Sequence, residues 1–377
     1  MNRLIFKKHL LAIALLLLCG VSAQAADDDL ITQQITIKLD KAGTLPDRIG
    51  SSKKYKITNL KIIGEINGTD LRLIRDMAGH DVEGDSTAGK LTSLDLADAQ
   101  IVSGGGKYYN PDFSTNCYCY TAKDKLGDCT FYKCSKLKYL IIPSSVTSIG
   151  DYAFDGCIGL TSCNIPSSVT SIGDCAFDGC IGLTSCNIPS SVTSIGDHAF
   201  FLCRNITSVV IPFGVGFISY YAFAGCFNLT NIVIPSSVTL IDMGAFEACG
   251  LKSIYIPTSV KYIGGGAFKN CSKLTSIYIS AEIPASTTNS TFEGVDKDKC
   301  ILYVPQGTYQ DYWLAEGWGD FKNIVEYDAT KVDNSVVDKE IKEVARYTAN
   351  GQRLDTPTKG LNIVRYSDGS VRKELHN

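Results

Sequence analysis

The chain has 377 residues, of which 45% are hydrophobic, and this is enough to bury a sizeable core. Its formal net charge of −3 excludes a generally basic surface of the kind that binds nucleic acid. Beyond residues 1–25, no stretch is long and apolar enough to predict a transmembrane span.

Residues 1–25 have the three parts of a secretory signal peptide. Arg3, Lys7 and Lys8 supply positive charge, an apolar run follows, and "AQA" ends at Ala25. Cleavage there leaves a chain of formal net charge −6. The rival interpretation is a lipoprotein acylated at Cys19, but the three leucines before this cysteine fit a lipobox poorly. Both alternatives predict an extracytoplasmic protein, secreted or associated with the outer membrane or cell surface.

Residues 26–125 predict an N-terminal cap followed by irregular early repeats. "ITNLKI" and "LTSLDL" share apolar residues at their first, fourth and sixth places, but their spacing is uneven. Between them, "DLRLIRDMAG" has helical periodicity, with Asp70 as a candidate N-cap and Gly79 as a stop. "SGGGK", from Ser103 to Lys107, resembles a phosphate loop only faintly, because it lacks the strand, the spacing and the Ser/Thr that follows Lys.

Residues 126–279 repeat with a period of 23, interrupted by a single step of 22. A period in this range fits a leucine-rich-repeat solenoid, in which repeats of roughly 20–29 residues stack on one another. Prolines, phenylalanines and cysteines recur at this interval: Pro143, Pro166, Pro189, Pro212, Pro235 and Pro257; Phe131, Phe154, Phe177, Phe200, Phe223, Phe246 and Phe268; Cys134, Cys157, Cys180, Cys203, Cys226, Cys249 and Cys271.

Each repeat predicts three short sides. "LTSIYI", from Leu274 to Ile279, predicts a strand, "SVTSIG" a second extended segment, and "AFDGC" one helical turn. The predicted fold class is a leucine-rich repeat solenoid, an α/β architecture of mostly short parallel β-strands and short helical turns. It is expected to be capped at both ends and followed by a small C-terminal β-module.

The repeat register assigns most of the cysteines to the core. The seven cysteines of the column, together with Cys163 and Cys186, occupy apolar positions, where free cysteine behaves as a small hydrophobe. Cys129 and Cys175 share a variable position that we expect to be exposed. Cys117 or Cys119 could pair with Cys129 in a disulfide. A zinc site is disfavoured because the spacing of these cysteines fits no common finger.

The motif "IPSSVTSIGDYAFDGCIGLTS" resembles the BspA-like leucine-rich repeats of Bacteroidetes surface proteins. The resemblance covers residues 126–279, where at least six copies agree in register. That family includes secreted adhesins and host-contact proteins. The resemblance therefore implies binding rather than chemistry, with an extracellular protein, from the host matrix or another surface, as the expected partner.

The remaining residues depart from the repeat. Residues 280–327, with Pro305 and a helix carrying Trp313 and Trp318, predict a C-terminal cap, although an aromatic pair can also bind sugars. Residues 328–340 predict a linker. Residues 341–377 predict a small β-module with turns at Asn350-Gly351 and Asp368-Gly369. "NGQRL" and "KGLNIVRYSDGSVRK" resemble, more loosely, the C-terminal sorting domain of type IX secretion cargo, which implies contact with secretion machinery.

No catalytic, cofactor or metal motif is recognised. His80 and His198 stand alone, while His9 lies in the signal and His376 near the C-terminus. We find no Ser-His-Asp, HExxH or P-loop pattern, so an enzyme is not expected.

The candidate site is a surface made by the third and fifth residues of each strand, which point away from the core. Its residues are Tyr139, Ile141, Asn164, Asn187, Val210, Val233, Tyr255 and Tyr278. The leading hypothesis is an adhesin that recognises a protein through this surface. The alternatives are a glycan-binding component of a nutrient system and an envelope scaffold without a soluble ligand. β-branched and aromatic residues also simply suit strands.

Overall fold

The computed structural model describes residues 29–110 and 119–329, Thr356 and four C-terminal strands. The predicted signal peptide, Cys19, Cys117 and nearly all of the predicted linker lie outside the described residues. So do the turns expected at Asn350-Gly351 and Asp368-Gly369. Among the described residues, no helix has the length and apolarity needed to cross a membrane.

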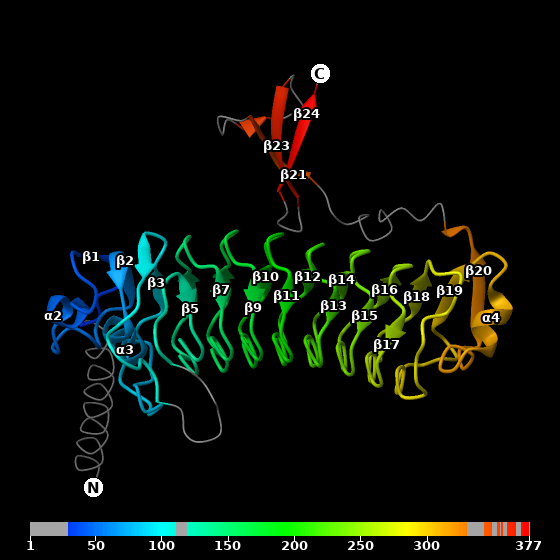
Figure 1. Cartoon of the computed structure of the whole chain (residues 1–377), viewed down its shortest axis with the longest axis horizontal. Helices are drawn as coiled ribbons and strands as arrows, with labels where there is room; N and C mark the ends of the chain where they lie inside the picture. The colour runs from blue at the N-terminus through cyan, green and yellow to red at the C-terminus, as the bar shows by residue number, and fades with distance from the viewer. Residues whose placement is uncertain are drawn as a thin grey trace, which may run out of the picture.

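The chain winds into a solenoid of parallel strands stacked along one long axis (Figure 1). The first side of each turn carries the longer strands, and their pairing places each residue beside its equivalent in the next repeat, as at Cys163 and Cys186. These strands are β1 (Ile35–Leu39), β2 (Asn59–Ile66), β3 (Ser93–Asp95), β6 (Tyr139–Ile141), β8 (Ser162–Asn164), β10 (Ser185–Asn187), β12 (Ser208–Val210), β14 (Asn231–Val233), β16 (Ser253–Ile256), β18 (Ser276–Ile279), β19 (Ile301–Pro305) and β20 (Asn323–Tyr327); β4 (Ala99–Ile101) also pairs with β2.

The second side of each turn carries two-residue strands, as "SVTSIG" predicted. They are β5 (Lys125–Leu126), β7 (Ser148–Ile149), β9 (Ser171–Ile172), β11 (Ser194–Ile195), β13 (Phe217–Ile218), β15 (Leu240–Ile241) and β17 (Tyr262–Ile263). The second residue of each strand is buried and the first faces outward. The predicted solenoid fold is therefore confirmed.

The third side differs from its prediction, because "AFDGC" forms a hydrogen-bonded turn rather than a turn of helix. The Tyr152 N–H donates to Asp174 O at 2.8 Å, and the Phe154 N–H donates to Ala176 O at 2.7 Å, in the next repeat. Tyr152 has a left-handed φ of 55°, as do its equivalents Cys175, His198 and Tyr221 at 51–54°. Alternate N–H groups thus bond to the neighbouring repeat instead of closing a helix.

The core is a stack of phenylalanine rings that runs the length of the repeats. Adjacent rings lie 4.9–5.8 Å apart between centroids from Phe131 to Phe268, and Phe292 extends the stack at 5.5 Å. Beside each ring, a cysteine thiol donates to the phenylalanine carbonyl of the preceding repeat, as from Cys180 Sγ to Phe154 O at 3.1 Å. Each repeat therefore buries its apolar residues only by stacking on its neighbours.

The N-terminal end is closed by β1 and by two helices, α2 (Leu45–Ile49) and α3 (Gly68–Met77). Asn67, not Asp70, is the N-cap of α3, and its side chain accepts a hydrogen bond from the Thr69 N–H. Asp70 is fully buried at the third helical position, where it accepts hydrogen bonds from the Asn67 N–H at 2.9 Å and the Leu45 N–H at 2.9 Å. This carboxylate ties α2 to the start of α3.

The C-terminal end is closed by β20 and by α4 (Tyr309–Leu314). Trp318 follows α4, is fully buried, packs 4.9 Å from Phe292 and donates from Nε1 to Ala285 O at 2.8 Å. Trp313 is 51% exposed, so only one of the two tryptophans expected to cover the last repeat does so. The four C-terminal strands form an antiparallel sheet: β21 (Glu343–Thr348), β22 (Arg353–Leu354), β23 (Gly360–Tyr366) and β24 (Val371–His376).

Candidate binding surface

The outward residues of β6, β8, β10, β12, β14, β16 and β18 form one surface, here called the strand face. The middle residue of each strand is buried, so that its neighbours on either side point away from the core. Pairing in register sets these residues in two rows. One row includes Tyr139, Ser162 and Ser185, and the other includes Ile141, Asn164 and Asn187.

The structure brings all eight candidate residues onto the strand face. Tyr139 is 55% exposed, Ile141 39% and Val210 40%. Asn164 and Asn187 are exposed, and the remaining three, Val233, Tyr255 and Tyr278, are half-buried. The middle of the face is polar, and the large apolar residues lie toward its two ends.

The aromatic end of the strand face extends one strand beyond the candidate residues. Tyr303 in β19 pairs with Tyr278, and the two rings stack with centroids 4.5 Å apart and planes within 2°. Tyr327 meets both rings edge-on, and its hydroxyl donates to Ile279 O at 2.9 Å. Burial raises the pKa of Tyr278 and of Tyr327, so both phenols are neutral at physiological pH.

Sequence reasoning missed Tyr303 because Ile301 pairs with Ser276, a step of 25 residues that breaks the period of 23. The alternation in "ILYV", which matches "SIYI", was the signal that could have found it. Lys61 and Asp95, at the other end of the same row, were also missed because the early repeats are irregular. Lys61 Nζ lies 3.3 Å from Asp95 Oδ2 and 2.7 Å from Asp98 Oδ2.

The cysteines expected in the core are buried there, but one expectation about the others is wrong. Cys129 is fully buried rather than exposed, and Cys175, at the equivalent position, is half-buried. Arg75 of α3 donates from Nη1 to Cys129 O at 3.0 Å, and the Cys129 N–H donates to Asp151 O of the next repeat at 2.8 Å, so this turn is packed from both sides. Cys119 is also buried, and its pairing, like that of Cys117, stays a prediction.

The buried thiols are held in their neutral form. Burial raises the pKa of Cys134 to about 11 and that of Cys271 to about 12. A nucleophilic thiolate is therefore disfavoured at these positions. In the part of the chain that the structure describes, no three His, Cys, Asp or Glu side chains are grouped to hold a metal ion.

His80 and His198 are built into packed surroundings. Burial and the nearby charge of Arg75 lower the pKa of His80, which favours its neutral form. The His198 ring stacks on Tyr221 with centroids 5.4 Å apart. In neither case is the histidine placed to act as a general base for a nucleophilic side chain.

A family model matches the regular repeats of the solenoid. Residues 124–249 and 195–303 match, in six copies, a family model described as the BspA type leucine rich repeat region. No curated protein matches the chain. Several solved structures are similar to parts of it.

Three of these structures are bacterial leucine-rich repeat proteins. A leucine rich cell surface protein from Faecalibacterium prausnitzii is 34% identical over 48% of this chain and 46% of its own, with a TM-score of 0.42. A leucine-rich repeat protein from Bacteroides ovatus is 29% identical over 54% and 58%, with a TM-score of 0.38. One from T. pallidum is 31% identical over 39% and 69%, with a TM-score of 0.36. The chain thus spans about half the length of the first two relatives.

Proposed function

We propose that this chain, whose residues 124–303 match the BspA type leucine rich repeat region, is exported and binds an extracellular protein through its strand face. The observation that carries the proposal is the pair of in-register rows, with exposed Tyr139, Ile141 and Val210. Aromatic and aliphatic side chains that stay exposed on an ordered surface are typical of protein-binding sites. The proposed role is adhesion or host interaction.

The shape of the strand face supports a macromolecular ligand. Strands lie about 4.8 Å apart, so β6 to β19 span roughly 34 Å. A long surface of this kind suits a protein segment, whereas small molecules bind in concave pockets. The described residues offer no constellation for catalysis on this face, and we infer binding rather than an enzymatic activity.

The aromatic end of the strand face favours a protein over a glycan. Sugars pack against the flat face of an aromatic ring, but Tyr278 and Tyr303 cover one face of each other at 4.5 Å. The part of these half-buried rings that stays exposed suits contacts with side chains and backbone groups. A glycan-binding role in nutrient uptake, and an envelope scaffold without a soluble ligand, remain the alternatives that the experiment separates.

The test is binding of purified residues 26–377 to an array of extracellular matrix proteins and, in parallel, to a glycan array. A strand-face variant carries Val210→Ser, Val233→Ser, Tyr255→Ser and Tyr278→Ser, and Ile283→Ser, at an 81% exposed residue outside the face, is the control. We expect at least a 10-fold loss of protein binding in the variant alone, because truncating interface hot spots costs about 2 kcal/mol or more.

The other outcomes would contradict this proposal. Protein binding that survives in the variant, with an unchanged thermal midpoint, places the ligand on another side of the solenoid. Selective binding on the glycan array supports the nutrient-uptake role. Absence of binding on both arrays supports the scaffold.

Export is proposed on the sequence features at the two ends of the chain. Residues 1–25 have the form of a signal peptide, and residues 341–377 resemble a sorting domain. Fractionation of cells that express the chain with and without residues 341–377 tests the second signal. Loss of the truncated chain from the surface and medium supports sorting, whereas unchanged surface display contradicts it.

A further inference from the structure

The second side of the solenoid carries another ordered surface, here called the lateral face. It consists of the outward first residues of the two-residue strands and the turn residues that lie three positions later. In one half, from β7 to β11, these residues are small or acidic: Ser148, Ser171 and Ser194, with Asp151, Asp174 and Asp197. At the N-terminal edge of the face, β5 adds the exposed Lys125 beside Ser148. In the other half the residues are large and apolar: Phe217, Leu240 and Tyr262, with Tyr220 and Met243. The composition changes at the single step from Ser194 to Phe217.

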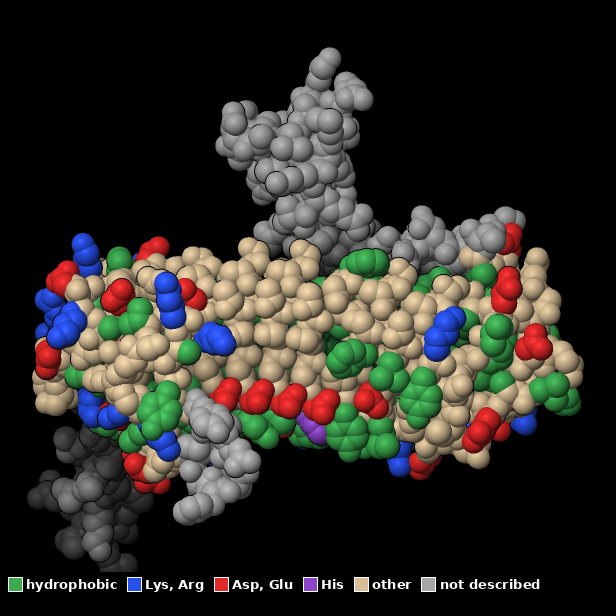
Figure 2. All heavy atoms as spheres, in the orientation of Figure 1, with side chains coloured by type: hydrophobic (Ala, Val, Ile, Leu, Met, Phe, Trp, Pro, Cys, Tyr) green, Lys and Arg blue, Asp and Glu red, His purple; other side chains and the backbone are tan. Residues whose placement is uncertain are grey.

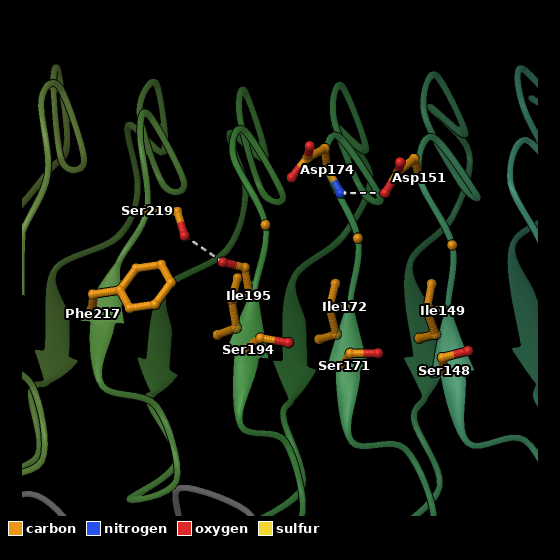
Figure 3. A pocket seen from close by; sticks show the side chains of 13 residues that line it. Ser148, Ile149, Asp151, Ser171, Ile172, Asp174, Ser194, Ile195, Phe217 and Ser219 are labelled. Atoms are coloured by element: carbon orange, nitrogen blue, oxygen red, sulfur yellow. Dashed lines mark hydrogen bonds between the residues drawn. The ribbon is translucent and has the colours of Figure 1, made fainter. Parts of the chain in front are cut away.

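The small half of the lateral face is hollowed into an open groove of about 440 Å³ (Figure 3). The groove runs across β7, β9 and β11, and the ring of Phe217 stands at its end. Glycine is required on its floor, because a Cβ on Gly150 would lie 2.6 Å from the backbone nitrogen of Asp128. The residues that line the groove include Asp151 and Asp174 but neither Lys nor Arg.

The aspartates form a ladder along one side of this groove. Asp151 Oδ1 accepts a hydrogen bond from the Asp174 N–H at 2.9 Å, and Asp174 Oδ1 accepts one from the Asp197 N–H at 2.8 Å. Asp197 Oδ1 accepts one from the Tyr220 N–H at 3.2 Å. One oxygen of each carboxylate is thereby fixed, and none of the ion pairs found among the described residues includes these three side chains. The space-filling view shows acidic side chains in a row on this side of the rod (Figure 2).

The large half of the lateral face leaves apolar side chains exposed. Phe217 is 49% exposed, Met243 47%, Tyr262 42% and Tyr220 37%. Strand pairing places Phe217 beside Leu240 and Leu240 beside Tyr262, so that these three form a continuous strip. A continuous apolar strip on an otherwise polar surface is a typical sign of an interaction site.

We propose that the lateral face docks an extended segment of a partner protein in which Lys or Arg residues adjoin apolar or aromatic residues. The basic side chains lie against the aspartate ladder, and the apolar side chains pack on Phe217, Leu240 and Tyr262. Opposite charges across an interface favour encounter and fix register. This surface is distinct from the strand face, so the two proposals stand or fall separately.

The spacing of the lateral face suits an extended chain that runs along the solenoid axis. Neighbouring repeats are about 4.8 Å apart, so Asp151 and Asp197 are separated by roughly 10 Å. An extended polypeptide covers that distance in about three residues. A nucleic acid is disfavoured, because its phosphates would face a row of carboxylates.

The experiment measures fluorescence anisotropy of labelled nine-residue peptides with residues 26–377. The probes are a set of peptides in which two Lys residues stand two or four positions apart, on one side of an extended chain, and are followed or preceded by Phe and Leu. A matched set has Glu in place of Lys. The variants are Asp174→Asn with Asp197→Asn, which keeps the Oδ1 acceptors, and Phe217→Ser. Val210→Ser with Val233→Ser, on the strand face, is the control.

We expect at least one Lys peptide to bind and its Glu counterpart not to bind. The double Asn variant should weaken binding at least 10-fold at low salt and reduce its salt dependence. Phe217→Ser should weaken binding with the salt dependence retained, and the strand-face control should bind like the native chain. The proposal is overturned if no Lys peptide binds, or if the double Asn variant binds as well as the native chain. Dimerisation that Phe217→Ser abolishes would also overturn it, since a second copy would then be the occupant.

Discussion

The thiols of the repeat cysteines have a structural role that explains their residue type. Cys203 Sγ donates to Phe177 O at 3.1 Å, and the same contact recurs at Cys226 and Cys249. A thiol is small and apolar enough to be buried against phenylalanine, yet it can still donate a weak hydrogen bond. Alanine would leave the carbonyl without this donor, and valine would overfill the space beside the rings.

The packing of the solenoid changes the pKa of Asp155. Burial and, to a smaller extent, the nearby charge of Asp178 raise its pKa to about 7 against the opposing effect of Lys133. The unfolded chain has an ordinary carboxyl with a pKa near 3.8. Between these two values the folded state binds more protons than the unfolded state, so the free energy of unfolding falls as the pH rises from about 4 to about 7.

We therefore predict that Asp155→Asn stabilises the protein at pH 8 and has little effect at pH 4. One pKa unit corresponds to about 1.4 kcal/mol, and partial exposure of the side chain reduces the expected gain to about 1–2 kcal/mol. The measurement is thermal unfolding across this pH range, with Asp311→Asn, at an exposed residue of α4, as the control. Equal effects of Asp155→Asn at both pH values would contradict the prediction.

Different interactions hold the three sides of each repeat in place. The two strand sides are held by parallel backbone pairing, which is interrupted between β10 and β12, between β14 and β16, and between β11 and β13. The turn side combines left-handed residues with a ring stack. A helical turn at "AFDGC" would close its N–H groups within the repeat. In the solenoid, the same groups bond to the next repeat and contribute to its docking.

A cavity opened in the stack of phenylalanine rings should lower the free energy of unfolding strongly. Phe177 is fully buried between Phe154 and Phe200, with centroids 4.9 Å and 5.1 Å away. Phe177→Ala should lower the free energy of unfolding by about 3–5 kcal/mol. Phe213→Ala, at a side chain 72% exposed, should change it by less than about 0.5 kcal/mol in the same denaturant titration. Similar losses in both variants would show that the stack is not the stabilising element.

Replacing each of the two tryptophans of the C-terminal cap by alanine should have different effects. Trp318→Ala should cost about 3–5 kcal/mol, because the indole is fully buried and its Nε1 hydrogen bond is lost. Because an uncapped solenoid unfolds from its end, hydrogen exchange should accelerate first in β18, β19 and β20. Trp313→Ala, at an exposed side chain, should leave the exchange of these strands unchanged. Uniform acceleration along the whole solenoid by Trp318→Ala would refute a capping role.

The whole molecule is a linear array, and its stability is built from contacts between neighbouring repeats. Residues 146–168 and 169–191 differ only at Tyr152 and Cys175, so one copy can be removed without changing the register. This arrangement predicts tolerance to loss of a complete repeat and intolerance to loss of a partial one.

Deletion of residues 169–191 should give a folded solenoid that is shorter by about 5 Å, the spacing of one strand. We expect an unchanged circular dichroism spectrum per residue and a thermal midpoint lowered by roughly a few degrees. Deletion of residues 169–180 should unfold part of the array, because the strands and rings then lose their register. Small-angle scattering and thermal melts check both deletions, and equal stability of the two would contradict the array model.

The sequence predicted the solenoid well because the same residue pattern recurs in every repeat. Phe154, Phe177 and Phe200 recur at the same interval as the strands, so burial of one implies burial of all. It also placed the eight candidate residues on one face, since alternation along a strand is a local property. It failed at Cys129, at the turn of "AFDGC" and at Tyr303, where neighbouring repeats or a step of 25 residues determine the outcome.

By itself, therefore, the sequence determined the repeat, the buried columns and the outward rows, because periodicity and strand alternation act within each copy. The tertiary structure decided which groups meet across copies. It showed that Cys thiols bond to Phe carbonyls, that aspartates form a ladder beside Phe217, and that Trp318 rather than Trp313 closes the end. These contacts depend on the stacking of separate turns in space, and no single repeat contains that information.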